Sequence, residues 1–122
     1  MVKTWAYIFG FVFVALGILG FVPAAIVHGK LLGLFAVNHM HNFIHLATGV
    51  AGLGAGYADS YWPALFLRIF GLIYLLVAAM GFYTGDGMLL GMVANNFADT
   101  ILHLVTGVAA LYLGFCWKCH KA

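Results

Sequence analysis

Long apolar stretches that carry almost no charged residues constrain the fold of this chain more than any other feature. No Asp, Glu, Lys or Arg occurs between residues 4 and 29, and three further stretches of similar length follow, with one or no charged residue in each. Because about 20 apolar residues in a helix cross a bilayer core of about 30 Å, each stretch is long enough to span a membrane. The sequence predicts an all-α integral membrane four-helix bundle in a single domain, 1–122, with spans near 4–22, 31–56, 63–83 and 88–117.

The scarcity of charge supports this class. Of 122 residues, 66% are hydrophobic and 7% are charged, against roughly half and a quarter in an ordinary soluble domain. The formal net charge of +2 comes without a basic cluster, which argues against a nucleic-acid partner. We expect the lipid bilayer as the main partner, with a homo-oligomer or a larger membrane complex as open possibilities.

The basic residues predict the orientation in the membrane. With four spans, both termini and the middle loop lie on one side, which collects Lys3, Arg68, Lys118 and Lys121 against Lys30 alone. Cytoplasmic loops carry the excess of Lys and Arg, so we expect cytoplasmic termini. Arg68 lies inside the third stretch but close enough to its end to extend to the headgroups.

The second and fourth stretches match each other. A shift of 58 residues aligns residues 31–53 with residues 89–111, and twelve of these 23 positions are identical. A weaker match at a shift of 61 places Gly10 on Gly71 and Gly20 on Gly81. The sequence therefore predicts two parallel-repeated helical hairpins, repeat 1 at about 4–56 and repeat 2 at about 63–117, related by an axis along the membrane normal.

Polar residues recur at helical spacing inside the second and fourth stretches. The second has Asn38, His41, Asn42, His45 and Thr48, and the fourth has Asn96, Asp99, Thr100, His103 and Thr106. Each set lies on one helix face and is unfavourable against lipid, so we expect both to face inward. At 1.5 Å per residue, the first His or Asp of each set lies about 15 Å into its predicted helix and the second about 21 Å.

Four of these side chains form a candidate metal site. His41 with His45, and Asp99 with His103, are two pairs at i, i+4 spacing. Three imidazoles and a carboxylate suit zinc, iron or another divalent metal. The supporting residues would be Asn38, Asn42 and Asn96. The alternatives are a hydrogen-bonded network without metal, a haem between His45 and His103, and an ion or proton pathway.

The C-terminal tail holds a second candidate site. Cys116, Cys119 and His120 have the C-x-x-C-H spacing of a c-type haem attachment. Such haem is attached on the outer face, whereas the predicted C-terminus is cytoplasmic, and only two residues follow. Three interpretations of this tail therefore remain: a haem-carrying electron-transfer subunit, a metal-binding or redox-active thiol pair, and an ordinary interfacial tail.

Catalysis is not indicated. The chain has no phosphate-binding loop, dinucleotide fingerprint or paired nucleophile and base, and few titratable residues remain outside the polar stripes. We expect a metal- or cofactor-binding or accessory membrane protein, with a structural subunit of a larger complex as an alternative.

The motifs together resemble a known family, the four-span bacterial integral membrane proteins grouped as domain of unknown function 4383. The resemblance covers nearly the whole chain and is carried by residues 19–23, 32–33, 38, 41–46, 96, 99 and 103–104. It implies a four-helix membrane fold, and a bacterial inner-membrane location follows, but it supplies no activity. The sequence differs from the family pattern at Thr100, where Asn is expected, and in the cysteine-bearing tail.

Overall fold

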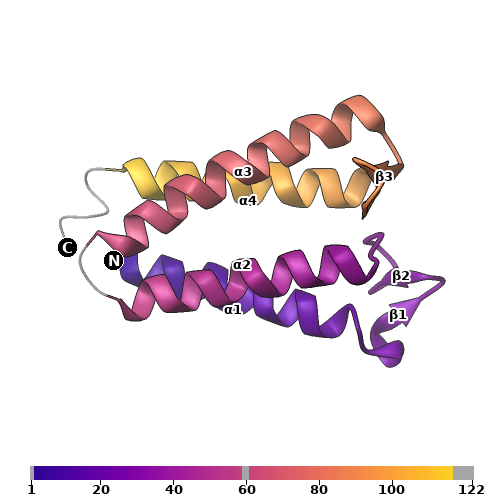
Figure 1. Cartoon of the computed structure of the whole chain (residues 1–122), viewed down its shortest axis with the longest axis horizontal. Helices are drawn as coiled ribbons and strands as arrows, with labels where there is room; N and C mark the ends of the chain where they lie inside the picture. The colour runs from indigo at the N-terminus through magenta and orange to yellow at the C-terminus, as the bar shows by residue number, and fades with distance from the viewer. Residues whose placement is uncertain (1, 59–60, 117–122) are drawn as a thin grey trace.

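Two helical hairpins lie side by side in the structure, a computed structural model that describes residues 2–58 and 61–116 (Figure 1). The first consists of α1 (Val2–Leu19) and α2 (His39–Tyr57), and the second of α3 (Trp62–Thr84) and α4 (Phe97–Phe115). The closest helix packing is within each hairpin, between α1 and α2 and between α3 and α4. The first residues of α1 and the last of α4 lie at one end of the bundle, and the loops within the hairpins lie at the other.

Each hairpin turns through a short antiparallel ribbon. A 3-10 turn, η1 (Pro23–Ala25), leads into β1 (Ile26–Val27) and β2 (Lys30–Leu31), while β3 (Gly87–Leu89) pairs with β4 (Val93–Asn95).

These ribbons correct the predicted helix boundaries. Helices α2 and α4 begin about two turns later than predicted, because the apolar residues before them form strands and turns. Leu32 and Leu90 have φ values of 54° and 53°, and the glycine after each, Gly33 and Gly91, has 74° and 71°. A helix cannot continue through two successive left-handed residues.

Within the described residues, three helices are long and apolar enough to cross a membrane: α1, α3 and α4. This finding supports the predicted membrane class. Helix α2 has 19 residues as well, but His and Asn side chains occupy its first two turns. It lies along α1, so it belongs to the same helical bundle.

Glycines allow the close approach of the helices within each hairpin. A Cβ atom on Gly10 of α1 would lie 2.8 Å from the Gly49 carbonyl oxygen of α2. A Cβ atom on Gly71 of α3 would lie 2.9 Å from the Gly107 carbonyl oxygen of α4. Side chains at these positions would force the backbones apart, so both hairpins depend on small residues for their packing.

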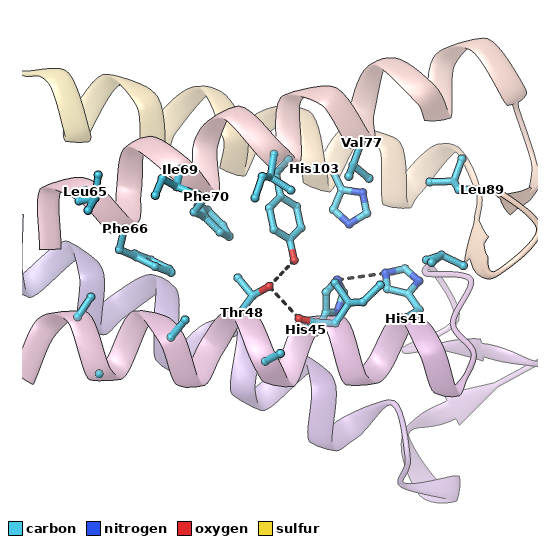
Figure 2. A pocket seen from close by; sticks show the side chains of 18 of the residues that line it. His41, His45, Thr48, Leu65, Phe66, Ile69, Phe70, Val77, Leu89 and His103 are labelled. Carbon is cyan, nitrogen blue, oxygen red and sulfur yellow. Dashed lines mark hydrogen bonds between the residues drawn. The ribbon is translucent and has the colours of Figure 1, made fainter. Parts of the chain in front are cut away.

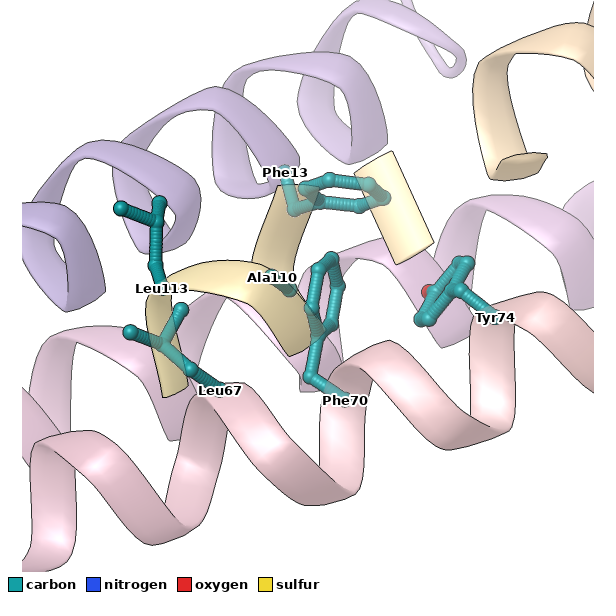
Figure 3. Close-up of a cluster of buried hydrophobic side chains, with 6 residues drawn as sticks. All are labelled: Phe13, Leu67, Phe70, Tyr74, Ala110 and Leu113. Atoms are coloured by element: carbon teal, nitrogen blue, oxygen red, sulfur yellow. The ribbon is translucent and has the colours of Figure 1, made fainter. Parts of the chain in front are cut away.

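A buried apolar cluster joins the two hairpins (Figure 3). Phe13 of α1 packs edge-to-face against Phe70 and Tyr74 of α3, with ring centroids 5.1 and 5.3 Å apart. Leu67 of α3 and Ala110 of α4 complete the contact between helices. This cluster fixes how α1 lies against α3, and therefore how the polar ends of α2 and α4 meet.

The Arg68 side chain of α3 contacts the C-terminal end of α4. Its Nε donates a hydrogen bond of 2.7 Å to the carbonyl oxygen of Gly114 in the last turn of α4. Its guanidinium carbon lies 4.6 Å from the centre of the Phe115 ring, within cation-π distance. The partly buried guanidinium of Arg68 thus links α3 to the C-terminal end of α4.

Candidate functional site

Two asparagines set the position of the polar stripes by capping α2 and α4. The Asn38 side chain accepts a 2.9 Å hydrogen bond from the His41 amide, and the Asn96 side chain accepts one of 2.9 Å from the Asp99 amide. Asp99 Oδ2 in turn accepts from the Asn96 amide at 3.1 Å, which completes a capping box. His41 and Asp99 therefore lie in the first turns of their helices, so the predicted depths of about 15 and 21 Å along the helices are wrong.

The four predicted ligands come together at these helix ends. His41, His45 and His103 are each 2% exposed or less, and Asp99 is fully buried. The three histidines present nitrogen atoms within 4.8 Å of one another. His41 Nε2 lies 3.1 Å from His45 Nε2 and 4.0 Å from Asp99 Oδ1. Two helices of different hairpins thus supply two side chains each.

Few of the polar atoms in this cluster have a partner. Neither ring nitrogen of His103 makes a hydrogen bond, and the Nδ1 atoms of His41 and His45 and the Oδ1 atom of Asp99 are also unpartnered. Burying a polar group without a hydrogen bond costs about 1–3 kcal/mol. Such atoms are uncommon in folded proteins and often indicate a missing ion or water.

An aromatic ring packs against each deeper histidine. The Phe13 ring lies edge-to-face on His45 with a centroid distance of 5.1 Å. The Tyr74 ring lies in the same way on His103 at 5.2 Å. These contacts restrict the rotation of both imidazoles and keep their nitrogens directed toward one another.

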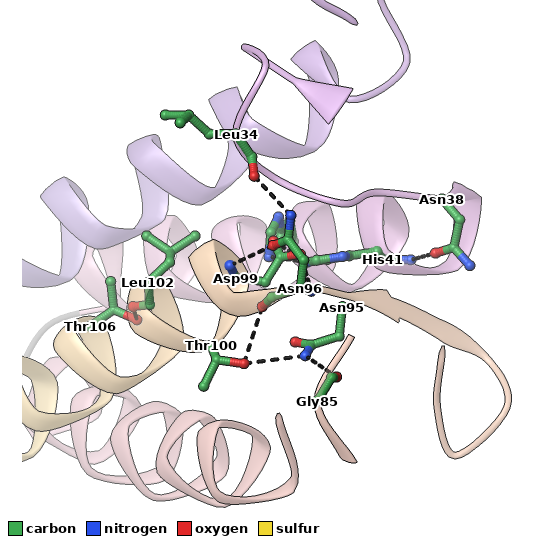
Figure 4. A network of polar contacts seen from close by, with 11 residues as sticks. Leu34, Asn38, His41, Gly85, Asn95, Asn96, Asp99, Thr100, Leu102 and Thr106 are labelled. Atoms are coloured by element: carbon green, nitrogen blue, oxygen red, sulfur yellow. Dashed lines mark hydrogen bonds and ion pairs between the residues drawn. The ribbon is translucent and has the colours of Figure 1, made fainter. Parts of the chain in front are cut away.

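The capping asparagines also join the two loops, and Figure 4 shows the bond from Asn96 to Leu34. Asn38 Nδ2 donates to the Met92 carbonyl oxygen at 2.9 Å, and Asn96 Nδ2 donates to the Leu34 carbonyl oxygen at 2.9 Å. Each loop therefore bonds the cap of the helix in the other hairpin. These bonds hold the first turns of α2 and α4 together.

The remaining stripe residues lie around the cluster. Asn42 is buried against Gly20, where any Cβ atom would overlap its amide group. Thr48 donates to the Ile44 carbonyl oxygen at 2.8 Å, so the Tyr74 hydroxyl, 2.9 Å away, donates to Thr48.

Two residues near the site escaped the sequence analysis. Asn95 donates to the Gly85 carbonyl oxygen and to Thr100 Oγ1, both at 3.2 Å. Tyr74 touches both His103 and Thr48. The available signal for Tyr74 was the shift of 61 residues, which aligns it with Phe13.

Cys116 does not belong to this cluster. Cys116 directly follows α4 as its C-cap, whereas Asp99 lies in the first turn of that helix. At 1.5 Å per residue the two are about 25 Å apart. Cys119 and His120 lie outside the described residues, so the haem motif remains a sequence-based hypothesis.

The fold and site define a class: a small helical bundle in which three of the described helices are long and apolar enough to cross a membrane, with a buried His/Asp cluster between two hairpins. The family described as Domain of unknown function (DUF4383) matches residues 3–116, and the chain belongs to that family. The predicted resemblance is thereby confirmed. Comparison with curated proteins and with solved structures gave no match.

Proposed function

We propose that this protein is a bacterial inner-membrane metal-binding protein in which His41, His45, Asp99 and His103 hold one divalent cation, zinc or iron. The observation that carries the proposal is the buried group of three imidazoles whose nitrogens lie within 4.8 Å of one another beside an unpartnered carboxylate oxygen. Three nitrogen ligands and one oxygen ligand form a familiar set for either metal.

The distances suit tetrahedral coordination. Two nitrogens bound to zinc at 2.0–2.1 Å lie about 3.3 Å apart in a tetrahedron, and the two Nε2 atoms of His41 and His45 are 3.1 Å apart. Asp99 Oδ1, at 4.0 Å from His41 Nε2, needs only a small movement to join them.

The metal-free network has less support. Within the described residues, the side chains of the cluster share one hydrogen bond, between His41 and His45, and His103 takes part in none. A stabilising network requires its members to be satisfied. A haem between His45 and His103 is also disfavoured, because the His41 ring lies 4.4 Å from the first and 5.7 Å from the second.

A metal bound at this site would also stabilise the contact between the two hairpins. Two ligands come from each hairpin, so a bound cation would cross-link α2 to α4. The reciprocal bonds of Asn38 and Asn96 support the further proposal that the hairpins are parallel repeats about an axis between them. With cytoplasmic termini, the site would lie toward the outer face, because the loops are at the opposite end of the bundle.

Elemental analysis of the purified protein tests the proposal. We expect close to one zinc or iron per chain, lost in His45→Ala and in His103→Ala and retained in the matched control His39→Ala, whose histidine lies outside the cluster. Asn38→Ala should retain most of the metal. The melting temperature of the wild type should fall on chelation and recover on metal addition, because binding to the folded state stabilises it. Absence of metal above background, before and after reloading, would contradict the proposal.

A further inference from the structure

A long cavity runs between α2 and α3, passes the histidine cluster and reaches the second loop at Leu89 (Figure 2). Its volume is about 760 Å³, within the usual range of ligand pockets. Apart from Ile44, Thr48 and the two histidines, α2 lines the cavity with small residues, whereas the facing side of α3 carries mostly bulky ones. The small residues are Ala47, Ala51, Gly54 and Ala55, and Ala58 follows at the C-cap.

The cavity is apolar along most of its length and polar at one end. Phe66, Ile69 and Phe70 line its middle, and His45, His103 and the hydroxyl of Thr48 lie toward the loops. His103 is 2% exposed, and both of its ring nitrogens lack a partner. An imidazole that gives one nitrogen to a metal keeps the other, so this end can bind a polar group whether or not the cluster is metallated.

The chemistry of the lining restricts the ligand's head group. No Asp, Glu, Lys or Arg of the described chain lines the cavity. In the metal-free protein a carboxylate, phosphate or ammonium head would therefore be buried without a counter-ion, which is strongly unfavourable. Neutral imidazoles and hydroxyls instead match an uncharged hydroxyl or carbonyl.

The shape restricts the rest of the ligand. The lining residues of α2 run from His41 to Ala55, and those of α3 from Trp62 to Met80, so the cavity extends over about 20–27 Å at 1.5 Å per residue. Such a length at this volume gives a narrow channel, which fits one extended chain. Ile69 and Ile73 on its wall are 51% and 50% exposed, so the cavity opens sideways to the surrounding lipid.

We propose that the cavity between α2 and α3 binds a single-chain, uncharged membrane lipid, with its hydroxyl or carbonyl head at His103, His45 and Thr48 and its chain along Phe66 and Ile69. The argument from charge concerns the metal-free protein, because a divalent cation bound at His45 and His103 would act as a counter-ion for an anionic head group. A long-chain alcohol and a prenyl- or alkyl-substituted quinone share this chemistry, and the experiment separates them.

Native mass spectrometry of the detergent-solubilised protein, with and without prior chelation, tests the proposal. The probes are oleyl alcohol, a decyl-substituted benzoquinone, and oleate as the charged counterpart of the alcohol. After chelation, we expect a 1:1 adduct with the alcohol or the quinone at least tenfold tighter than with oleate. The stronger of the two identifies the head group as a hydroxyl or a carbonyl.

Matched variants locate the binding. Ala51→Phe fills the cavity from a position that lines it, whereas Val50→Phe places the same ring on the neighbouring exposed position, which does not line it. We expect Ala51→Phe to weaken binding at least tenfold and Val50→Phe to leave it unchanged. Gly54→Leu, at a position with open space around its Cβ, serves if Ala51→Phe fails to fold.

Three outcomes would overturn the proposal. Oleate binding to the chelated protein as tightly as both uncharged probes would contradict the argument from charge. Equal binding by wild type and the filled variant would place the lipid elsewhere. A dimer that Ala51→Phe dissociates would show that a second copy of the chain fills the cavity.

Discussion

The two hairpins share a framework but differ in the side chains they bring to the site. Gly10 contacts Gly49 in the first as Gly71 contacts Gly107 in the second. Each hairpin has a left-handed Leu-Gly turn and an asparagine cap bonded to the other loop. At the first ligand position, however, the first hairpin has His41 and the second has Asp99. The difference indicates that the framework positions both helix ends alike, while a single substitution in one of them supplies the only carboxylate of the cluster.

The largest expected difference between the hairpins concerns their glycine contacts. A Cβ atom at Gly49 would overlap the Val14 amide nitrogen, whereas one at Gly107 would lie 2.9 Å from the Leu75 amide nitrogen. We expect Gly49→Ala to lower the free energy of unfolding by about 3 kcal/mol and Gly107→Ala by about 1–2 kcal/mol. Reversible unfolding in mixed micelles measures both.

Gly54→Ala is the control for these variants. Nothing lies within 4 Å of its added Cβ, so stability should stay the same or rise slightly, because alanine favours the helix. Equal losses for all three variants would contradict the packing argument.

Exchange of the two first ligands tests whether the hairpins are equivalent at the site. His41→Ala and Asp99→Ala should each weaken metal binding about 100-fold or more, since loss of even an outer hydrogen-bond partner costs 10–100-fold. The double variant His41→Asp/Asp99→His keeps the same ligand set with the carboxylate in α2. We expect its affinity, measured by competition with a chelating dye, to stay within about tenfold of the wild type, that is, within 1.4 kcal/mol. A double variant as weak as either single variant would show that the framework is not interchangeable.

The capping asparagines are expected to have similar effects. Asn38→Ala and Asn96→Ala each remove a helix cap and a bond to the opposite loop. The expected loss of unfolding free energy is about 1–2 kcal/mol for each. It should be slightly larger for Asn96, whose capping box also involves Asp99. An effect at one position alone would mean that only one loop contact matters in solution.

The smallest effect is expected at Tyr74, which aligns with Phe13. Tyr74→Phe makes the two aromatic positions alike and removes the hydrogen bond to Thr48. Thr48 keeps the Ile44 carbonyl as its acceptor, so the loss should be about 0.6 kcal/mol, the average for side-chain hydrogen bonds in membrane bundles. A loss above 2 kcal/mol would show that the hydroxyl has a further role.

Much of the architecture could be predicted from the sequence because apolar length and helical spacing are strong signals. The four helices follow from the uncharged stretches, and the meeting of the four proposed ligands follows from their i, i+4 spacing and the 58-residue match. The start of α2 could not be read from hydropathy, since Leu31 and Phe35 are as apolar in a turn as in a helix. Asn96, three residues before Asp99, is a helix-capping signal in the sequence and marks the true start of α4.

The cavity could not be predicted at all. Small residues such as Ala47 and Ala51 are equally compatible with tight helix packing, as at Gly49, and the sequence does not say which face meets a helix and which meets open space. The outcome depends on how the contact between Phe13 and Phe70 sets the position of one hairpin against the other, which is a property of the packed core.

The bond from Arg68 to Gly114 has a consequence for the dynamics of α4. A helix has a positive dipole end at its N-terminus and a negative end at its C-terminus. Helix α4 has the acidic Asp99 in its first turn and receives the guanidinium of Arg68 at its last, so both ends are electrostatically matched. Helix α2 has no acidic residue in its first turn and no basic residue in its last. The C-terminal turn of α2 should therefore fray first and exchange its amide hydrogens faster than the corresponding turn of α4.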